Sequence, residues 1–155
     1  MLQVGLSQQI LAILIIVTSL AACSNDVIYK NITQLNYGTS FGECIGYCKH
    51  EVTIKSKAVT FKCYSWDVMM QTLTKEAIIS STTSDSICSF NTTSFFKLPE
   101  TIGCPDCADG GAEWLEIILP NGDKHKVTFE YHHEPASIHD QIIKLREILN
   151  KNECK

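Results

Sequence analysis

The chain has 155 residues and a formal net charge of −4 at pH 7, with 13 Lys and Arg against 17 Asp and Glu. This acidic balance argues against a nucleic-acid-binding protein, which needs a basic patch. The length suits one domain with a modest core, and the absence of long runs of like charge argues against extensive disorder.

The N-terminal segment has the features of a targeting signal. The first 22 residues contain no charged side chain and include an apolar block, ILAILIIV, at residues 10–17. The block is shorter than the roughly 18 to 20 residues that cross a bilayer, and its length is typical of a signal peptide. Leu20-Ala21-Ala22-Cys23 follows it and resembles a bacterial lipobox. The resemblance implies cleavage before Cys23 and attachment of diacylglycerol and a further acyl chain such as palmitate.

This signal predicts the organisation of the chain. We expect a signal peptide at residues 1–22, a lipidated tether at residues 23–27 and a single domain at residues 28–155. Ser24 implies, as in lipoproteins of the enteric type, an outer-membrane location on the periplasmic or surface face. The alternative is an ordinary secretory signal that is cut nearby and leaves Cys23 as a normal thiol.

The first half of the domain predicts mainly strands. Residues 28–37 are rich in β-branched and aromatic side chains and are followed by Gly38, which indicates a strand that ends at Tyr37. Residues 50–55 and 58–65 alternate between apolar and polar side chains around Ser56-Lys57, which indicates a hairpin. Residues 68–72 are compatible with a continuation of its second strand.

The middle of the chain is less regular. Residues 74–77, with the sequence TKEA, predict a helix that runs towards Ser81. Residues 81–94 are polar and show no clear period, so they predict no definite element. Three apolar side chains before Pro99 are expected to anchor the core at the end of a short helical turn: Phe95, Phe96 and Leu98.

A second hairpin and a helix complete the domain. Residues 112–119 and 126–131 alternate on either side of Asn121-Gly122, the dipeptide typical of a hairpin turn. A helix is expected from Ser137, with Asp140 in the capping-box position. Its apolar face has helical spacing and consists of Ile138, Ile142, Leu145, Ile148 and Leu149. The predicted fold is α+β, with an antiparallel sheet of two hairpins plus an N-terminal strand and two helices on one face.

Two cysteine-bearing loops are the most distinctive feature of the domain. Cys44 and Cys48 lie in SFGECIGYC, and Cys104 and Cys107 lie in GCPDCADGGAEW. Each loop leads into the first strand of a hairpin, so we expect both loops at the same end of the sheet. The other cysteines are Cys23, Cys63, Cys88 and Cys154. If the first of these carries lipid, an odd number remains, and at least one thiol is unpaired or bonded between molecules.

Three interpretations of the two loops stay open. In the first, Cys44, Cys48, Cys104 and Cys107 form two structural disulfides, which export to an oxidising compartment favours. The pairing cannot be deduced from the sequence. In the second, the four thiolates bind a structural zinc ion. In the third, Cys104 and Cys107 form a thiol-redox centre, although such a pair usually precedes a helix rather than a strand.

The second loop holds further candidate residues. Asp106, Asp109 and Glu113 suggest a calcium site, but their spacing does not match an EF-hand loop, and solvated turn acids are the alternative. Gly110-Gly111 is expected to form a turn into the following strand. Trp114 is expected in the core or at its edge.

Other aromatic and histidine residues carry weaker hypotheses. Tyr37 and Trp66 are expected as core or core-edge aromatics. His132-His133 with His139 suggests either a transition-metal site or a polar connection into the last helix. The sequence contains no hydrolase, metalloprotease or nucleotide-binding motif.

The sequence FGECIGYC, followed by a hairpin and then by GCPDCADGGAEW, resembles motifs of small cysteine-bearing lipoproteins of Bacteroidota type. The likeness covers most of residues 32–149 and implies lipid anchoring, but it implies no activity. We therefore expect a lipid-anchored, non-catalytic envelope domain that is cross-linked by disulfides, uses no cofactor and contacts the membrane and another envelope protein. The alternative is a periplasmic thiol-redox or metal-dependent protein that uses the Cys104–Cys107 loop, with zinc as the metal.

Overall fold

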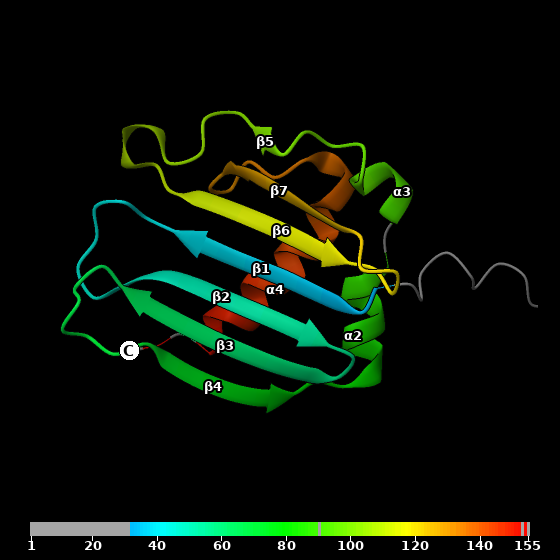
Figure 1. Cartoon of the computed structure of the whole chain (residues 1–155), viewed down its shortest axis with the longest axis horizontal. Coiled ribbons are helices and arrows are strands. Elements are labelled where there is room, and N and C mark those ends of the chain that lie inside the picture. Colours follow the sequence, from blue (N-terminus) through cyan, green and yellow to red (C-terminus); the bar gives the residue numbers. More distant parts are fainter. Residues whose placement is uncertain (1–31, 90, 153, 155) are drawn as a thin grey trace, which may run out of the picture.

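A single mixed sheet organises the domain. The computed structural model describes residues 32–89, 91–152 and 154. Within these residues, seven strands form the sheet in the order β4-β3-β2-β1-β6-β7-β5 (Figure 1). The strands are β1 (Gln34–Ser40), β2 (Tyr47–Lys55), β3 (Ala58–Ser65), β4 (Leu73–Ile78), β5 (Thr101–Ile102), β6 (Ala112–Ile118) and β7 (Lys124–Glu130).

The sheet confirms the predicted fold class and extends it. Strand β1 lies between the two predicted hairpins, pairing antiparallel with β2 on one side and with β6 on the other. Strand β4 adds an antiparallel edge next to β3, and the short β5 pairs parallel with β7. The α+β prediction is therefore confirmed, but the sheet is mixed and larger than two hairpins plus one strand.

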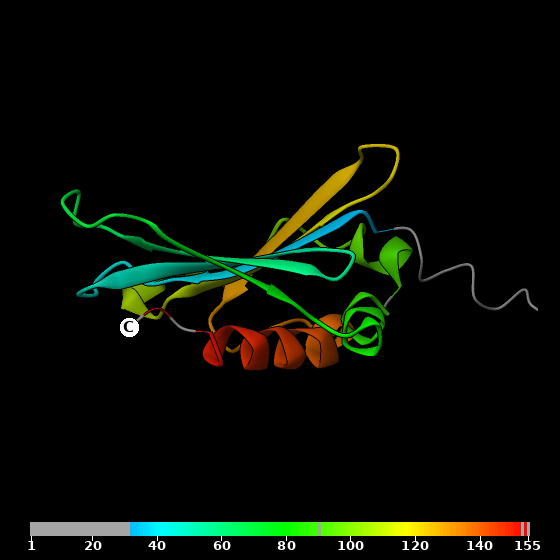
Figure 2. The ribbon, with the colours of Figure 1, turned by 90° about the horizontal axis from the view of Figure 1, so that it is seen from below.

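Helices cover one face of the sheet. The helical elements are α2 (Ser81–Cys88), α3 (Thr92–Phe95), the 3₁₀ turns η1 (Cys107–Asp109) and η2 (Ala136–Ile138), and α4 (His139–Asn150). Figure 2 shows α2 and α4 on the same side of the sheet, while the other side is open. No helix among the described residues has the length and apolar character needed to cross a membrane.

The core lies between the sheet and α4. Alternate residues of each strand face the helices, so the apolar half of each alternating pattern is buried. The fully buried large apolar side chains include Leu35, Phe61, Ile87, Phe95, Leu115, Ile117, Phe129, Ile142 and Leu145. Each such side chain stabilises the fold by roughly 1.5–3 kcal/mol relative to exposure. The expectation that Phe95 anchors the core is confirmed.

The predicted helix at residues 74–77 is wrong, because these residues lie in β4. Six residue pairs join β4 to β3, and the hydrogen bonds of that ladder outweigh the helix preference of Lys, Glu and Ala. The helix starts later, at Ser81, where the Ser80 side chain accepts a hydrogen bond of 3.0 Å from the Thr83 backbone N–H. The polar stretch with no definite prediction thus forms α2.

The last helix is confirmed, but its predicted start is not. The 3₁₀ turn η2 includes Ser137, and α4 begins at His139 with no capping hydrogen bond from a side chain. The predicted capping box with Asp140 is therefore absent. The apolar face is confirmed, since Ile138, Ile142, Leu145 and Leu149 are buried.

Gly38 lies inside β1, where the sequence pattern predicts the end of the strand. It pairs with Trp114 in β6 and with Glu51 in β2. A Cβ atom at this position would lie 2.2 Å from Cζ2 of the Trp114 ring and 2.7 Å from the backbone oxygen of His50. A glycine is required here because the indole ring lies directly over the β1 backbone.

Replacing this glycine tests the packing of the indole. We expect Gly38→Ala to lower the free energy of unfolding by about 2 kcal/mol, because the added methyl group forces the Trp114 ring to move. Urea denaturation measures this change. Gly42→Ala is the matched control, since its Cβ would meet only the carboxylate end of Asp106, at 3.1 Å. Equal stability of the two variants would contradict the assignment.

Candidate functional site

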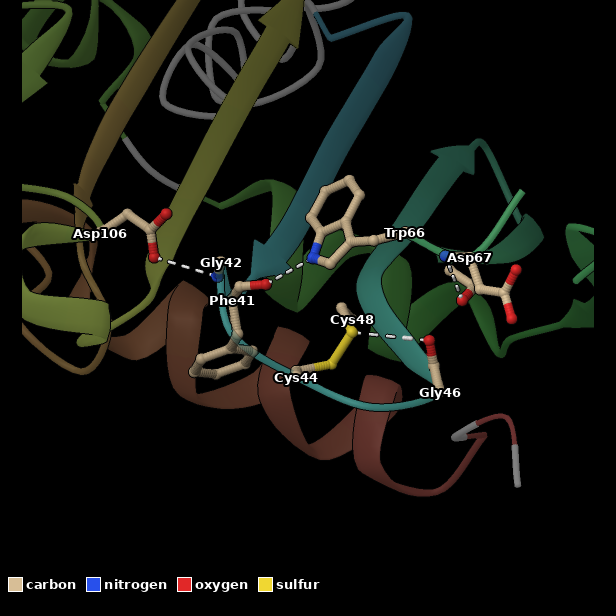
Figure 3. Close-up of a disulfide and its surroundings, with 9 residues drawn as sticks. Phe41, Gly42, Cys44, Gly46, Cys48, Trp66, Asp67 and Asp106 are labelled. Atoms are coloured by element: carbon tan, nitrogen blue, oxygen red, sulfur yellow. Dashed lines mark hydrogen bonds between the residues drawn. A yellow bond between two sulfur atoms is a disulfide. The ribbon is translucent and has the colours of Figure 1, made fainter. Parts of the chain in front are cut away.

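The two cysteine loops lie at the same end of the sheet, as predicted. Ser40 at the end of β1 pairs with Ala112 at the start of β6, so the segments beyond them leave the sheet side by side. The Gly42 backbone N–H donates a hydrogen bond of 3.3 Å to Oδ1 of Asp106 (Figure 3). We call residues 41–46, 66–72 and 103–111 the loop end.

Each predicted cysteine pair is bonded within its own loop. Cys44 pairs with Cys48, four residues away, and Cys104 pairs with Cys107, three residues away (Figure 3 shows the first pair). The prediction of disulfides in these loops is confirmed, and the structure decides the pairing that the sequence left open. Such short closures contribute about 2 kcal/mol each in the chain-entropy model.

A further disulfide joins two cysteines to which the sequence assigned no role. Cys63 in β3 pairs with Cys154 beyond α4, across a separation of 91 residues. The chain-entropy model assigns a closure of this length about 4 to 5 kcal/mol. Among the described cysteines Cys88 is free and half-buried. Burial raises the pKa of its thiol, and the nearby Asp85 carboxylate adds to this effect. Cys23, the predicted lipidation site, lies outside the described residues.

The four loop cysteines do not form a common group. Cys44 and Cys48 occupy one loop, Cys104 and Cys107 the other, and each pair is already bonded internally. Across residues 32–89, 91–152 and 154, no group of three or more His, Cys, Asp and Glu side chains is placed to hold a metal ion. The zinc alternative therefore gains no geometric support from the described residues.

The three acids of the second loop diverge. Asp106 accepts from Gly42, whereas Asp109 is exposed at the end of η1. Glu113 lies in β6 with its side chain buried on the helix side of the sheet. The carboxylates suggested for calcium thus do not share a site.

Gly110 and Gly111 lead the second loop into β6 as predicted. Gly111 has a φ of +83°, the positive value expected for the turn. A Cβ atom on it would lie 2.5 Å from the Phe41 ring, so the residue also allows the two loops to pack closely.

The predicted histidine cluster also divides. The His132 backbone N–H donates a hydrogen bond of 3.2 Å to Oε2 of Glu113. Nδ1 of His133 lies 3.8 Å from Oε2 of Glu130. His139 instead bonds Glu134 at 2.6 Å. These residues form a polar connection from β7 into α4, the alternative to a metal site.

Trp114 is a core-edge aromatic, as expected. Its side chain emerges on the open face, because consecutive residues of a strand point to opposite sides and Glu113 points inward. Only 7% of Trp114 is exposed. The ammonium groups of Lys49 and Lys126 lie over its ring, 5.6 Å and 4.7 Å from the centroid. This coverage leaves no aromatic platform for a flat ligand.

A buried ionic network lies beneath the second loop. Glu113 is fully buried and accepts hydrogen bonds of 2.8 Å from Nε and 2.6 Å from Nη2 of Arg146 in α4. It also accepts the hydroxyl hydrogen bond of Tyr37 in β1. Arg146 reaches Glu134 as well, and Glu134 in turn bonds His139. The network connects β1, β6, the β7–α4 connection and α4.

Three groups of the network have shifted pKa values: Glu134, Tyr37 and Arg146. Burial alone would raise the pKa of Glu134, but the hydrogen bonds and charge of Arg146 outweigh it and lower that pKa to about 2. Burial and the neighbouring Glu113 raise the pKa of Tyr37 above its usual value. Burial alone would lower the pKa of Arg146, but Glu113 and Glu134 raise it.

The β3–β4 loop presents apolar side chains that the sequence analysis missed. Val68 and Met69 are 95% and 86% exposed. Trp66, expected in the core or at its edge, is half exposed. Its indole N–H donates a hydrogen bond of 2.7 Å to the Phe41 backbone oxygen (Figure 3). Ile45 of the neighbouring loop is fully exposed. A short apolar run in a turn, DVMM, was the available signal in the sequence.

The Cys104–Cys107 disulfide lies beside a small concavity. Both cysteines are exposed, and the concavity of about 180 Å³ is lined by Glu130, Tyr131 and His133 as well. Oε1 of Glu130 accepts a hydrogen bond of 2.7 Å from the Cys104 backbone N–H. A titratable carboxylate and an imidazole thus lie next to an accessible disulfide.

Comparisons with known proteins add no family. No protein-family model matches the chain, and no curated protein matches it. The function is therefore argued from the loop end and its chemistry.

The central arginine of the network can be tested directly. We expect Arg146→Met to lower the free energy of unfolding by about 3–5 kcal/mol, because it leaves the Glu113 carboxylate buried without its partner. Urea denaturation measures the loss, and Lys151→Met, at an exposed position just after α4, is the control. Adding Glu113→Gln to Arg146→Met should restore part of the stability. A loss below about 1 kcal/mol in the single variant would contradict the role of the pair.

The low pKa of Glu134 predicts a pH dependence. Its pKa falls from the usual 4.5 to about 2 in the folded state, so its contribution to stability is present above pH 4.5 and is lost as the pH falls towards 2. We expect the free energy of unfolding to decrease by about 3 kcal/mol from this group across that window. Urea denaturation at several pH values should show a correspondingly smaller decrease for Glu134→Gln. Identical pH profiles would refute the assignment.

Proposed function

We propose that this protein is a cell-envelope lipoprotein, anchored through lipid on Cys23, whose domain is non-catalytic and binds another envelope protein through the loop end. The observation that carries the proposal is the group of exposed apolar side chains at an end that disulfides cross-link. Exposed apolar groups of this kind are typical of interaction surfaces, and a rigid scaffold commonly presents binding residues on its loops.

The placement of the loop end relative to the anchor supports the proposal. The first described residues lie at the opposite end of the sheet (Figure 1). There the Thr33 backbone N–H donates a hydrogen bond of 2.9 Å to the backbone oxygen of Ile118. Strand β1 then runs the length of the sheet to the loop end. A lipid at Cys23, before this starting point, would leave the loop end free to face away from the membrane.

A thiol–disulfide exchange protein is the second candidate, favoured by the accessible Cys104–Cys107 pair beside Glu130 and His133. In such a reaction a substrate thiolate attacks one sulfur of the pair, which forms a mixed disulfide and frees the other cysteine as a thiolate. A second substrate thiolate then attacks the substrate sulfur of the mixed disulfide, so that the substrate leaves as a disulfide and both cysteines are reduced. The surrounding carboxylates of Asp106 and Asp109 disfavour a thiolate here. Cys107 itself begins the 3₁₀ turn η1, and a strand follows, so the pair lacks the helix dipole that activates redox cysteines.

One measurement separates these proposals: the intact mass of the membrane-extracted protein, treated in its folded state with no reductant or with increasing reductant and then denatured and alkylated. We expect a chain that begins at Cys23 with a lipid adduct and one alkylated thiol, that of Cys88. All three described disulfides should resist mild reductant, since structural disulfides have low reduction potentials.

The other outcomes are equally informative. Alkylation of Cys104 and Cys107 without reductant, or at a reductant level that leaves the other pairs intact, would favour the exchange protein. An unlipidated chain that begins before Cys23 would overturn the membrane anchor. Four or more alkylated thiols would reject the structural disulfides and return zinc to consideration.

A further inference from the structure

Within the three segments of the loop end, all charged side chains have the same sign. The loop end carries four exposed carboxylates: Glu43, Asp67, Asp106 and Asp109. Its three segments, residues 41–46, 66–72 and 103–111, contain no Lys or Arg. A surface that joins exposed apolar groups with a border of negative charge selects a partner with the complementary arrangement.

The apolar tip is also held in a defined conformation. The backbone N–H of Asp67 donates a hydrogen bond of 3.0 Å to Oγ of Ser65. Oδ1 of Asp67 accepts a hydrogen bond of 2.9 Å from the Met69 backbone N–H. The Met70 backbone N–H donates a hydrogen bond of 3.0 Å to the Asp67 backbone oxygen and so closes the turn. Because the turn is already ordered, binding through Val68 and Met69 loses little backbone entropy.

The anchoring aromatic of the tip is fixed as well. The indole N–H of Trp66 donates a hydrogen bond to the Phe41 backbone oxygen. The Tyr47 hydroxyl donates a hydrogen bond of 3.3 Å to the backbone oxygen of Gln71. These two hydrogen bonds join the β3–β4 loop to the β1–β2 loop. Tryptophan and methionine are enriched at protein interfaces, and a pre-ordered tryptophan is a common centre of binding energy.

We propose that the loop end inserts Val68 and Met69 into an apolar pocket on another protein, and that Lys and Arg side chains surround this pocket. This proposal rests on the proposed function, in which the loop end is the binding surface, and it names the chemistry of the partner. The lysines or arginines of the partner would face Glu43, Asp67 and Asp106.

The same charges disfavour two other occupants. Bacterial and other biological membranes present anionic lipid, and segments that insert into them carry Lys and Arg next to the apolar residues rather than Asp and Glu. A second copy of this chain would bring one acidic loop end against another, and like charges at an interface are unfavourable.

Variants of matched charge test the proposal. Glu43→Gln, Asp67→Asn and Asp106→Asn together remove three charges from the loop end, and the two asparagines keep an oxygen that accepts the existing hydrogen bonds. The control removes three exposed charges elsewhere, through Glu76→Gln, Glu100→Gln and Asp123→Asn, and has the same net charge. For the apolar contact, Val68→Ser is compared with Ile78→Ser, which changes a side chain that is 85% exposed at the other end of β4.

The readout is photo-crosslinking of the full-length protein in membranes of its own cells, with a benzophenone side chain placed at Gln71, an exposed position of the same loop that leaves Val68 and Met69 intact. We expect a crosslink to a protein, and mass spectrometry of the joined peptides should place it on a surface with more Lys and Arg than Asp and Glu. Raising the salt from about 50 to about 500 mM, or neutralising the three loop-end charges, should lower the yield roughly tenfold. Val68→Ser should lower it too, and both control variants should retain it.

The possible failures are distinguishable. A protein crosslink that is insensitive to salt and to the loop-end charges, or that maps to an acidic surface, would overturn this inference and leave the proposed function standing. A crosslink to phospholipid or to a second copy would overturn it in favour of those occupants. The absence of any crosslink from position 71 would overturn both the inference and the proposed binding role of the loop end.

Discussion

Arg146 lies between the carboxylates of Glu113 and Glu134, in the layer where α4 packs against the sheet. A buried carboxylate without a partner is costly, so these groups can be buried only together. Their bonds also include Tyr37 at the centre of the sheet. The network therefore determines where α4 lies along β1 and β6, and it does so with directional hydrogen bonds, which apolar packing alone lacks.

The position of Glu113 has consequences for the loop that precedes it. Once its side chain faces α4, the next residue, Trp114, must face the open side, where the absence of a Cβ atom on Gly38 leaves room for the indole. The strand then begins at a defined place opposite Ser40, and the cysteine loop before it meets Phe41 and Gly42. The two disulfide-bonded loops are thus positioned by the Glu113–Arg146 pair on the helix side of the sheet and by the Trp114 ring on the open side.

This construction gives the loop end a defined surface. The domain places an ordered apolar turn with Val68 and Met69 beside loops that two local disulfides hold, and it surrounds them with carboxylates. Rigid loops and exposed apolar side chains suit recognition of a protein. The predicted lipid anchor at Cys23 precedes β1, which begins at the opposite end of the sheet, and this order agrees with the proposal that the loop end reaches a partner away from the membrane.

Local patterns of the sequence predicted the α+β class, both hairpins, the apolar face of the last helix and the disulfides of the two loops. These features depend on periodicity, turn residues and cysteine spacing, which act over a few residues. Residues 74–77 show the limit, since a helix-favouring segment became a strand when β3 offered an edge. The pairing of Cys63 with Cys154, the inward position of Glu113 against Arg146 and the exposure of Trp66 depend on contacts between residues far apart in the chain. Only the tertiary structure decides such contacts, because the free energy of burying a charge or a ring depends on what the rest of the fold places beside it.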